Sequence, residues 1–323
     1  MKKKILSVLL AIAMIGVTGC AGPREDGGND AMLNIGILQL MEHSSLDDAR
    51  EGFVQALADN GYVEGQNIKI DYQNAQGDPN NLNTMSQRLA GNKSDLVLAI
   101  GTGAAQSIAS VTEEIPVLFT AVTDPVDSGL VNTNEAPGTN LSGTNDMSPI
   151  KEQIELLVQL CPDIETVGIV YCSGEDNSIL QAQQVKEVLE EMSLNWTEAT
   201  VTNTNDVQQV TQSVAGKCDA IYIPTDNAYA SAMGIVAEIA KENKLPVVCG
   251  AIEMVRDGGF ATLGLNYYNL GYQTGEMAVR VLKGENISQM PVESLVKYDY
   301  YISAEMAQVL GVEIPEELSE YVK

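Results

Sequence analysis

The sequence predicts an α/β protein with two lobes around a cleft, each lobe built on a parallel sheet with helices on both faces. Short apolar runs alternate with amphipathic helical stretches from residue 33 onward, which is typical of parallel sheets covered by helices. The rhythm restarts at about Met147, and a chain of 323 residues is long enough for two domains. Two sheets of similar size are therefore expected.

In the first half, strands are expected at 34–40, 67–72, 96–100, 116–121 and 141–143, and helices at 46–60, 82–90 and 104–112. The run 96–100 is wholly apolar, as suits a strand that is buried on both faces. In the second half, a helix at 150–160 follows Ser148 and Pro149, a good cap and first-turn pair. Strands are then expected at 166–171, 194–200, 220–224, 246–249 and 261–265, and helices at 178–192, 207–215, 230–242 and 270–282.

The N-terminus carries an export signal. Lys2, Lys3 and Lys4 precede an apolar stretch, 5–17, that is too short for a comfortable membrane span. The following Val17-Thr18-Gly19-Cys20 resembles a bacterial lipobox, which implies cleavage before Cys20 and lipidation of that cysteine. We therefore expect a lipoprotein signal peptide at 1–20 and a flexible tether at 21–32, which is polar and rich in glycine. The alternative is a plain secretory signal with a chance cysteine.

Composition excludes several function classes. The formal charge of −26 argues against nucleic acid as a partner, because phosphate backbones are held by Lys and Arg. The remaining cysteines, Cys161, Cys172, Cys218 and Cys249, are scattered singly, and the chain has one histidine, so no metal site is expected. The sequence lacks GxSxG and HExxH motifs and the lysine of a phosphate-binding loop. We predict neither a cofactor nor an enzyme.

The stretch 95–110 is the first candidate for a binding site. The buried strand 96–100 ends at Gly101-Thr102-Gly103, and a helix starts at Ala104. A strand, a glycine turn and a helix start bring free backbone N–H groups and a positive helix end to one point, where carboxylates bind well. The alternative is an ordinary turn whose glycines only relieve strain.

Several stretches together resemble the solute-binding proteins of ABC importers, and more narrowly the group that binds tryptophan and related aromatic amino acids. In order, they are QLMEH at 39–43, GYVEGQN at 61–67, NAQGD at 74–78, AVTDP at 121–125, EDNS at 175–178 and PTDN at 224–227. The resemblance implies the type I periplasmic-binding-protein architecture, with two Rossmann-like lobes joined by three hinge crossovers. By this analogy the N-terminal lobe is 33–147 plus 265–290, and the C-terminal lobe is 148–264 plus 291–323. Gly103 stands where proline is expected in the family's turn.

In such a protein, Thr102, Gly103 and Ala104 hold a ligand carboxylate. Thr123 and Asp124 flank the same cleft, although Asp124 also suits an Asx-type turn before Pro125. In the second lobe, a helix is expected to begin at the cleft with Glu175, Asn177 and Ser178. These residues could cap the helix, bind the ligand carboxylate, or do both. Asp226 is expected to pair with the ammonium group of the ligand, and Asn227 is expected to lie beside it at the cleft. The alternative is that the two residues only form a turn.

His43 lies just past the first strand and is either a pocket residue or, as is usual for a lone histidine, structural or solvated. Gln39, Leu40 and Met41 are expected to line the same opening of the cleft. Glu253 and Asn266 fall at later strand ends and complete the predicted ligand-binding set. The expected function is that of a monomeric, lipid-anchored substrate-binding component of an ABC importer, with permease and ATPase subunits as partners. The expected ligand is tryptophan, phenylalanine or tyrosine. A sugar or nucleoside binder, or a ligand-sensing lipoprotein of the same fold, is the alternative.

Overall fold

A computed structural model describes residues 32–323 of the chain. The expected signal peptide, Cys20 and all but the last residue of the expected tether lie outside the described residues. Within 32–323, no helix combines the length and the apolar character that a membrane span requires.

The first lobe is built on a six-stranded sheet in the order β11-β5-β4-β3-β1-β2. Its strands are β1 (Leu33–Gln39), β2 (Ile68–Asn74), β3 (Leu96–Ile100), β4 (Val117–Val122), β5 (Leu141–Asn145) and β11 (Glu293–Ser294). All neighbouring strands pair in parallel. Every residue of β3 and β4 is buried, because helices cover both faces of the sheet.

The second lobe has a six-stranded sheet in the order β12-β10-β9-β8-β6-β7. Its strands are β6 (Thr166–Cys172), β7 (Asn195–Val201), β8 (Ala220–Ile223), β9 (Val247–Cys249), β10 (Ala261–Gly264) and β12 (Asp299–Ile302). Strand β12 pairs antiparallel to β10, and the other pairs are parallel. The predicted pair of parallel sheets is confirmed, with one antiparallel edge strand that the sequence analysis did not predict.

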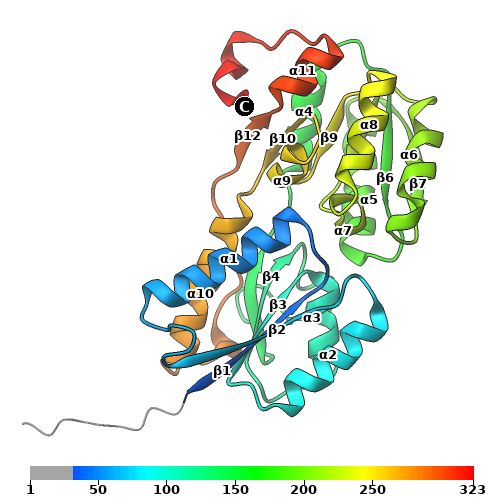
Figure 1. Ribbon diagram of the computed structural model, residues 1–323. Helices are drawn as coiled ribbons and strands as arrows, with labels where there is room; N and C mark the ends of the chain where they lie inside the picture. The colour runs from blue at the N-terminus through cyan, green and yellow to red at the C-terminus, as the bar shows by residue number, and fades with distance from the viewer. Residues whose placement is uncertain (1–31) are drawn as a thin grey trace, which may run out of the picture. The chain divides into compact units, whose positions relative to one another are not determined.

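Helices cover the first sheet in two pairs. Helix α1 (Ser44–Asp59) packs against α10 (Tyr267–Leu282) on one face, and α2 (Pro79–Gly91) packs beside α3 (Thr102–Ala109) on the other (Figure 1). Helix α10 begins three residues earlier than expected, because the side chain of Asn266 caps it by accepting from the backbone N–H of Asn269.

The second sheet is covered by α4 (Ile150–Leu160), α5 (Asp176–Glu191), α6 (Val207–Ala215), α7 (Asn227–Ala230), α8 (Met233–Asn243), α9 (Ile252–Arg256) and α11 (Ala304–Leu310). Short 3-10 turns lie at η1 (Thr204–Asp206), η2 (Ile287–Gln289) and η3 (Glu316–Tyr321). The single helix expected at 230–242 starts earlier, because Asp226 caps α7, and it is two helices, because Ala232 leaves the helical conformation with φ of −120° before α8 begins.

The chain passes between the sheets after β5, after β10 and after β11. The third passage differs from the boundary expected after residue 290. Glu293 and Ser294 pair with Thr144 and Asn145 of β5, so the chain leaves the first sheet only after Ser294. The Glu293 carboxylate accepts from Gln273 of α10 at 2.7 Å, which holds this short edge strand on the first lobe.

Candidate functional site

A cleft lies between the lobes, at the carboxyl ends of strands from both sheets, where open α/β sheets usually bind ligands. It contains a cavity of about 670 Å³, here called the outer cavity. The first lobe contributes Leu40, Met41, Gln76, Gly77, Asp78, Pro79, Leu82, Thr102, Gly103 and Gln106 to its wall. The second lobe contributes Cys172, Gly174, Glu175, Asp176, Asn177, Thr202, Asn203, Thr204, Asn205 and Ala228.

A smaller cavity of about 20 Å³, here called the inner cavity, also lies between the lobes. Its lining is His43, Ser45, Leu46, Ala121, Thr123, Asp146, Asn177, Thr225, Asp226, Asn227, Ala230, Ala251, Met254 and Tyr267. Asn177 lines both cavities, so the two share a wall. The predicted site residues Met41, His43, Thr102, Gly103, Thr123, Glu175, Asn177, Asp226 and Asn227 all line one cavity or the other.

The start of α3 forms part of the outer cavity's first-lobe wall. Gly101 precedes the helix with φ of 94°, a left-handed conformation that favours glycine. Thr102 and Gly103 then line the cavity, whereas Ala104 is fully buried and lies outside both cavities. A β-carbon on Gly103 would lie 3.3 Å from Leu40 Cδ1, so a larger side chain there must displace its neighbours.

The start of α5 lines the same cavity from the second lobe. Gln106 of α3 donates from Nε2 to Asp176 Oδ2 at 3.1 Å and so bridges the two helices. Asn177 donates from Nδ2 to the carbonyl of Thr225 at 3.0 Å. Ser178 is fully buried behind it and lies outside the lining of both cavities.

The acidic pair Glu175 and Asp226 holds the start of α7. The Glu175 carboxylate accepts from both nitrogens of Asn227, at 3.1 Å and 2.6 Å, and from the backbone N–H of Ala228 at 3.0 Å. Burial, with Asp226 close by, raises the pKa of Glu175 above its usual range. Asp226 accepts from the backbone N–H groups of Cys172 at 2.6 Å and Tyr229 at 2.8 Å, one on each oxygen. Each oxygen of the carboxylate expected to bind a ligand amine therefore already accepts from one backbone donor.

His43 connects the lobes beside the inner cavity. Its Nε2 lies 3.1 Å from Asn227 Oδ1. Among residues 32–323, no group forms a hydrogen bond with Nδ1, which is buried. Burial lowers the pKa of the imidazole, which favours its neutral form.

Thr123 belongs to a second polar bridge between the lobes. Gln181 of α5 donates from Nε2 to Thr225 Oγ1 at 2.6 Å and to Thr123 Oγ1 at 3.3 Å. Asp124, the next residue, accepts from the backbone N–H groups of Val126 and Asp127 at 3.0 Å. This is the Asx-type turn that the sequence also allowed, and Asp124 lies outside both cavities.

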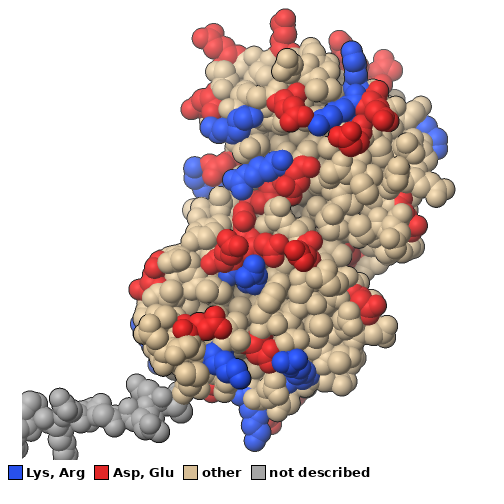
Figure 2. Space-filling view, viewed as in Figure 1, with Lys and Arg blue, Asp and Glu red and all other residues tan. Residues whose placement is uncertain are grey.

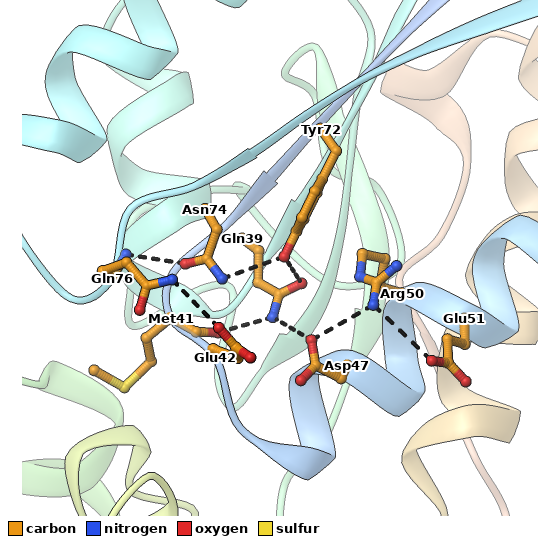
Figure 3. A network of polar contacts seen from close by, with 9 residues as sticks. All are labelled: Gln39, Met41, Glu42, Asp47, Arg50, Glu51, Tyr72, Asn74 and Gln76. Atoms are coloured by element: carbon orange, nitrogen blue, oxygen red, sulfur yellow. Dashed lines mark hydrogen bonds and ion pairs between the residues drawn. The ribbon is translucent and has the colours of Figure 1, made fainter.

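Gln39 supports the site from behind (Figure 3). Its side chain is fully buried and donates from Nε2 to the carbonyl of Met41 at 2.8 Å and to Asp47 Oδ1 at 2.9 Å. Tyr72 donates to Gln39 Oε1 at 3.1 Å, and the guanidinium carbon of Arg50 lies 5.0 Å from the centre of the Tyr72 ring. Gln39 thus joins β1, β2 and α1 and fixes the loop that carries Met41 and His43.

Glu253 and Asn266 lie outside both cavities. Glu253 is 1% exposed, and within the described part of the chain neither of its oxygens accepts a hydrogen bond. The nearest cation is Arg256, with Nη1 at 3.8 Å, and burial raises the pKa of Glu253 to about 7. Asn266 serves as the cap of α10.

Sequence reasoning missed Asp146, Tyr267, Thr225 and Gln181. Asp146 follows β5 directly, so the rule that selected Thr123 and Asp226 at strand ends applies to it as well. No group of three or more His, Cys, Asp or Glu side chains in 32–323 is placed to hold a metal ion. The outer cavity offers two helix starts and an apolar corner of Leu40, Met41 and Leu82, an arrangement suited to binding a small molecule with both charged and apolar parts.

Comparison with known proteins agrees with this geometry. Residues 34–323 match the ABC transporter substrate binding protein family. A tyrosine-binding protein from Clostridioides difficile is 38% identical over 96% of this chain and 93% of its own length. A Streptococcus pneumoniae ABC domain in complex with L-Trp superposes with a TM-score of 0.87 at 37% identity, covering 91% of this chain and all of that one.

A third relative is a ligand-free, open substrate-binding protein with adhesive properties from Clostridium difficile. It is 43% identical, covering 90% of this chain and 98% of its own, but its TM-score is 0.70. The chain therefore superposes more closely on the L-Trp complex than on this open relative. Proteins of this family bind their substrates outside the cytoplasm and deliver them for transport, and they are not enzymes. The chain belongs to the ABC transporter substrate-binding proteins and is the solute-binding component of an ABC importer.

Proposed function

We propose that this protein captures an aromatic amino acid, tyrosine, tryptophan or phenylalanine, in the outer cavity and closes its lobes around it. The observation that carries the proposal is the pair of helix starts, α3 and α5, that line one cavity from opposite lobes. Helix starts favour anions, so they suit a ligand carboxylate. Thr102 and Gly103 are the first-lobe contacts, and Asn177 is the contact from the second lobe.

The outer cavity also suits an aromatic side chain. Its volume of about 670 Å³ lies in the range of roughly 300–1,000 Å³ that is typical of small-molecule sites. Leu40, Met41 and Leu82 supply apolar surface beside α3. The relatives named for tyrosine binding or solved with L-Trp support the same ligand class.

Calorimetric titration of the purified protein with each of the twenty amino acids tests this proposal. An aromatic amino acid is expected to bind with a Kd below about 100 μM, equivalent to roughly −5.5 kcal/mol. Sugars and nucleosides serve as the comparison set. Binding of a sugar or nucleoside without any aromatic amino acid would overturn the ligand assignment.

The anchor and partners complete the proposed function. A lipid on Cys20, followed by the 21–32 tether, would hold the protein at the outer face of the cell membrane beside the permease, with the ATPase subunits on the opposite side. The lipobox-like Val17-Thr18-Gly19-Cys20 supports this arrangement. Labelling cells with a palmitate analogue should mark the wild-type protein and should not mark Cys20→Ser. Equal labelling of both proteins would contradict the anchor.

A further inference from the structure

The inner cavity holds a buried carboxylate with an unused oxygen. Asp146 follows β5 at the first passage between the lobes and is 4% exposed. Its Oδ2 accepts from the hydroxyl of Tyr267, the first residue of α10, at 2.5 Å. Among residues 32–323, no group makes a hydrogen bond of normal geometry to Oδ1, although that atom is buried and the Thr123 hydroxyl lies near the carboxylate. A buried carboxylate oxygen without a partner is costly, so it calls for a donor.

The protein supplies no positive charge to this site. In the part of the chain that the structure describes, no lysine or arginine lines the inner cavity. His43 does line it, but burial lowers the pKa of its imidazole and favours the neutral form. Burial raises the pKa of Asp146, so its ionised form is costly unless it is paired. A positive charge to pair with it must therefore come from a bound molecule.

The other acidic residues of the two cavities are already committed. Asp226 and Glu175 accept from the backbone at the start of α7, as described above. Asp78 accepts from the backbone N–H groups of Asn80 and Asn81 and caps α2. Asp176 is exposed and accepts from Gln106. Among residues 32–323, Asp146 is thus the buried carboxylate lining these cavities that has an oxygen without a hydrogen-bond partner.

The size and place of the inner cavity fit a small cationic group. Its volume of about 20 Å³ exceeds the roughly 10–15 Å³ that one water-sized group needs, and an ammonium group is of similar size. Asn177 lines this cavity and also the outer cavity, where the helix starts lie. Because the α-ammonium and α-carboxylate groups of an amino acid share one carbon atom, both groups would lie where the two cavities meet beside Asn177.

We propose that Asp146 receives the α-ammonium group of the bound amino acid on Oδ1, while Tyr267 holds the carboxylate in position through Oδ2. This inference rests on the proposed function and assigns the amine end of the ligand, which the sequence analysis gave to Asp226. Thr123 and His43 lie in the same lining and complete a small polar pocket around that group.

The competing explanation is purely structural. Asp146 and Tyr267 lie at two of the passages between the lobes, and Tyr298, near the third passage, donates to the carbonyl of Met147 at 3.0 Å. In that case the Asp146–Tyr267 bond would only fix the hinge. Asp146→Asn separates the two explanations, because asparagine keeps an acceptor for Tyr267 and removes the charge. Tyr267→Phe removes the hydroxyl donor and keeps the carboxylate of Asp146.

The experiment compares an amino acid with its analogue that lacks the amino group. The calorimetric probes are L-tyrosine with 3-(4-hydroxyphenyl)propionate, and L-tryptophan with indole-3-propionate. Asp146→Asn should weaken amino acid binding about 10- to 100-fold, because a hydrogen-bonded charge pair is lost, and should leave the analogue's affinity unchanged. Tyr267→Phe should weaken amino acid binding by less than about tenfold. Asp163→Asn, at an exposed aspartate between α4 and β6, is the matched control and should change neither affinity.

A measurement without ligand adds an independent readout. Because Asp146→Asn removes an unpaired buried charge, it should raise the melting temperature of the ligand-free protein. Equal loss of affinity for the amino acid and its analogue would overturn the assignment in favour of the hinge explanation. Unchanged amino acid binding in Asp146→Asn would overturn the assignment and leave the proposed function standing. A wild-type protein that binds none of the twenty amino acids would overturn both.

Discussion

The backbone of α10 at Gly271 lies directly against the backbone of α1 at Ala49. A β-carbon on Gly271 would lie 1.8 Å from the carbonyl oxygen of Ala49, and one on Gly52 would lie 2.0 Å from the carbonyl oxygen of Tyr268. The two helices therefore pack through glycines from both sides, far closer than larger side chains allow. This pair of helices covers one face of the first sheet, and α10 begins with Tyr267.

The close contact makes Gly271 sensitive to substitution. Gly271→Ala should lower the free energy of unfolding by about 2–4 kcal/mol, because α1 and α10 must separate to admit one methyl group. Gly234→Ala in α8 is the matched control, since a β-carbon there has no atom within 4 Å. It should be neutral or slightly stabilising. Denaturant unfolding checks both variants, and equal stabilities would contradict this packing.

Gly103 should matter for binding more than for folding. Gly103→Val places a branched side chain at the start of α3, next to Leu40 and in the wall of the outer cavity. We expect a loss of at least about tenfold in aromatic amino acid affinity, equivalent to about 1.4 kcal/mol. Gly91→Val, at the exposed end of α2, is the control and should bind normally. Unchanged affinity in Gly103→Val would remove the start of α3 from the ligand site.

Glu253 should make stability depend on pH. Burial raises its pKa to about 7, with Arg256 and Asp48 as the charged neighbours that face it. The folded protein then holds the proton more tightly than the unfolded chain does. This contribution to stability is full below about pH 4.5 and is lost as the pH rises through 7.

Glu253→Gln removes this pH-dependent loss. At pH 8 the variant should be more stable than the wild type by roughly 1–3 kcal/mol, and the difference should shrink toward pH 5. Glu114→Gln, at an exposed position, is the control. Denaturant unfolding between pH 4.5 and 8 measures the difference. A gap between Glu253→Gln and wild type that stays constant with pH would refute the role given to Glu253.

A surface bond between the lobes should contribute to closure. Ser44, at the start of α1, donates to Asp257 Oδ2 of the second lobe at 2.6 Å, and Arg256 Nη1 lies 3.6 Å from Asp48. Acidic side chains gather over α1 on the face shown in Figure 2. Arg256 also lies 3.8 Å from Glu253, so it has carboxylates of both lobes as neighbours. The hydroxyl of Ser44 adds a donor to this acidic region.

Ser44→Ala should weaken ligand binding about two- to fivefold, because it destabilises the closed arrangement without touching either cavity's charged groups. Ser213→Ala, which removes an exposed hydroxyl on α6, is the control. Calorimetry measures the affinities, and small-angle scattering reports the fraction of closed molecules. Identical affinities in Ser44→Ala and wild type would show that this bond plays no part in closure.

The sequence predicted most of the fold because its strands are marked by apolar runs and its helices by periodicity. It did not predict β11, because two residues carry no periodic pattern, nor the antiparallel pairing of β12. The break between α7 and α8 also escaped prediction. Ala232, with φ of −120° and ψ of 15°, interrupts the helix there, whereas Asp226 sets its earlier start and joins it to Cys172 of β6.

The sequence was less informative about the roles of single side chains. Polar residues that follow strands do gather at the cleft, as Thr123 after β4 and Asp226 after β8 illustrate. Whether such a residue faces a ligand or bonds the protein itself depends on distances of a few tenths of an ångström. Asp226 and Asp146 both follow strands and are both buried, yet one has two backbone donors and the other has a free oxygen.

The three passages between the sheets also govern how the chain folds. Helix α10 packs against α1, although the whole run from α4 to β10 lies between them in the chain. Strand β12 pairs with β10, although α10 and β11 lie between those two strands. Neither lobe is one continuous segment. Long-range pairings of this kind slow folding more than they cost in stability, since loop-closure entropy grows only with the logarithm of loop length. Each lobe is therefore completed only by residues that follow a segment of the other lobe in the chain, and the residues from α10 onward contribute to both cores.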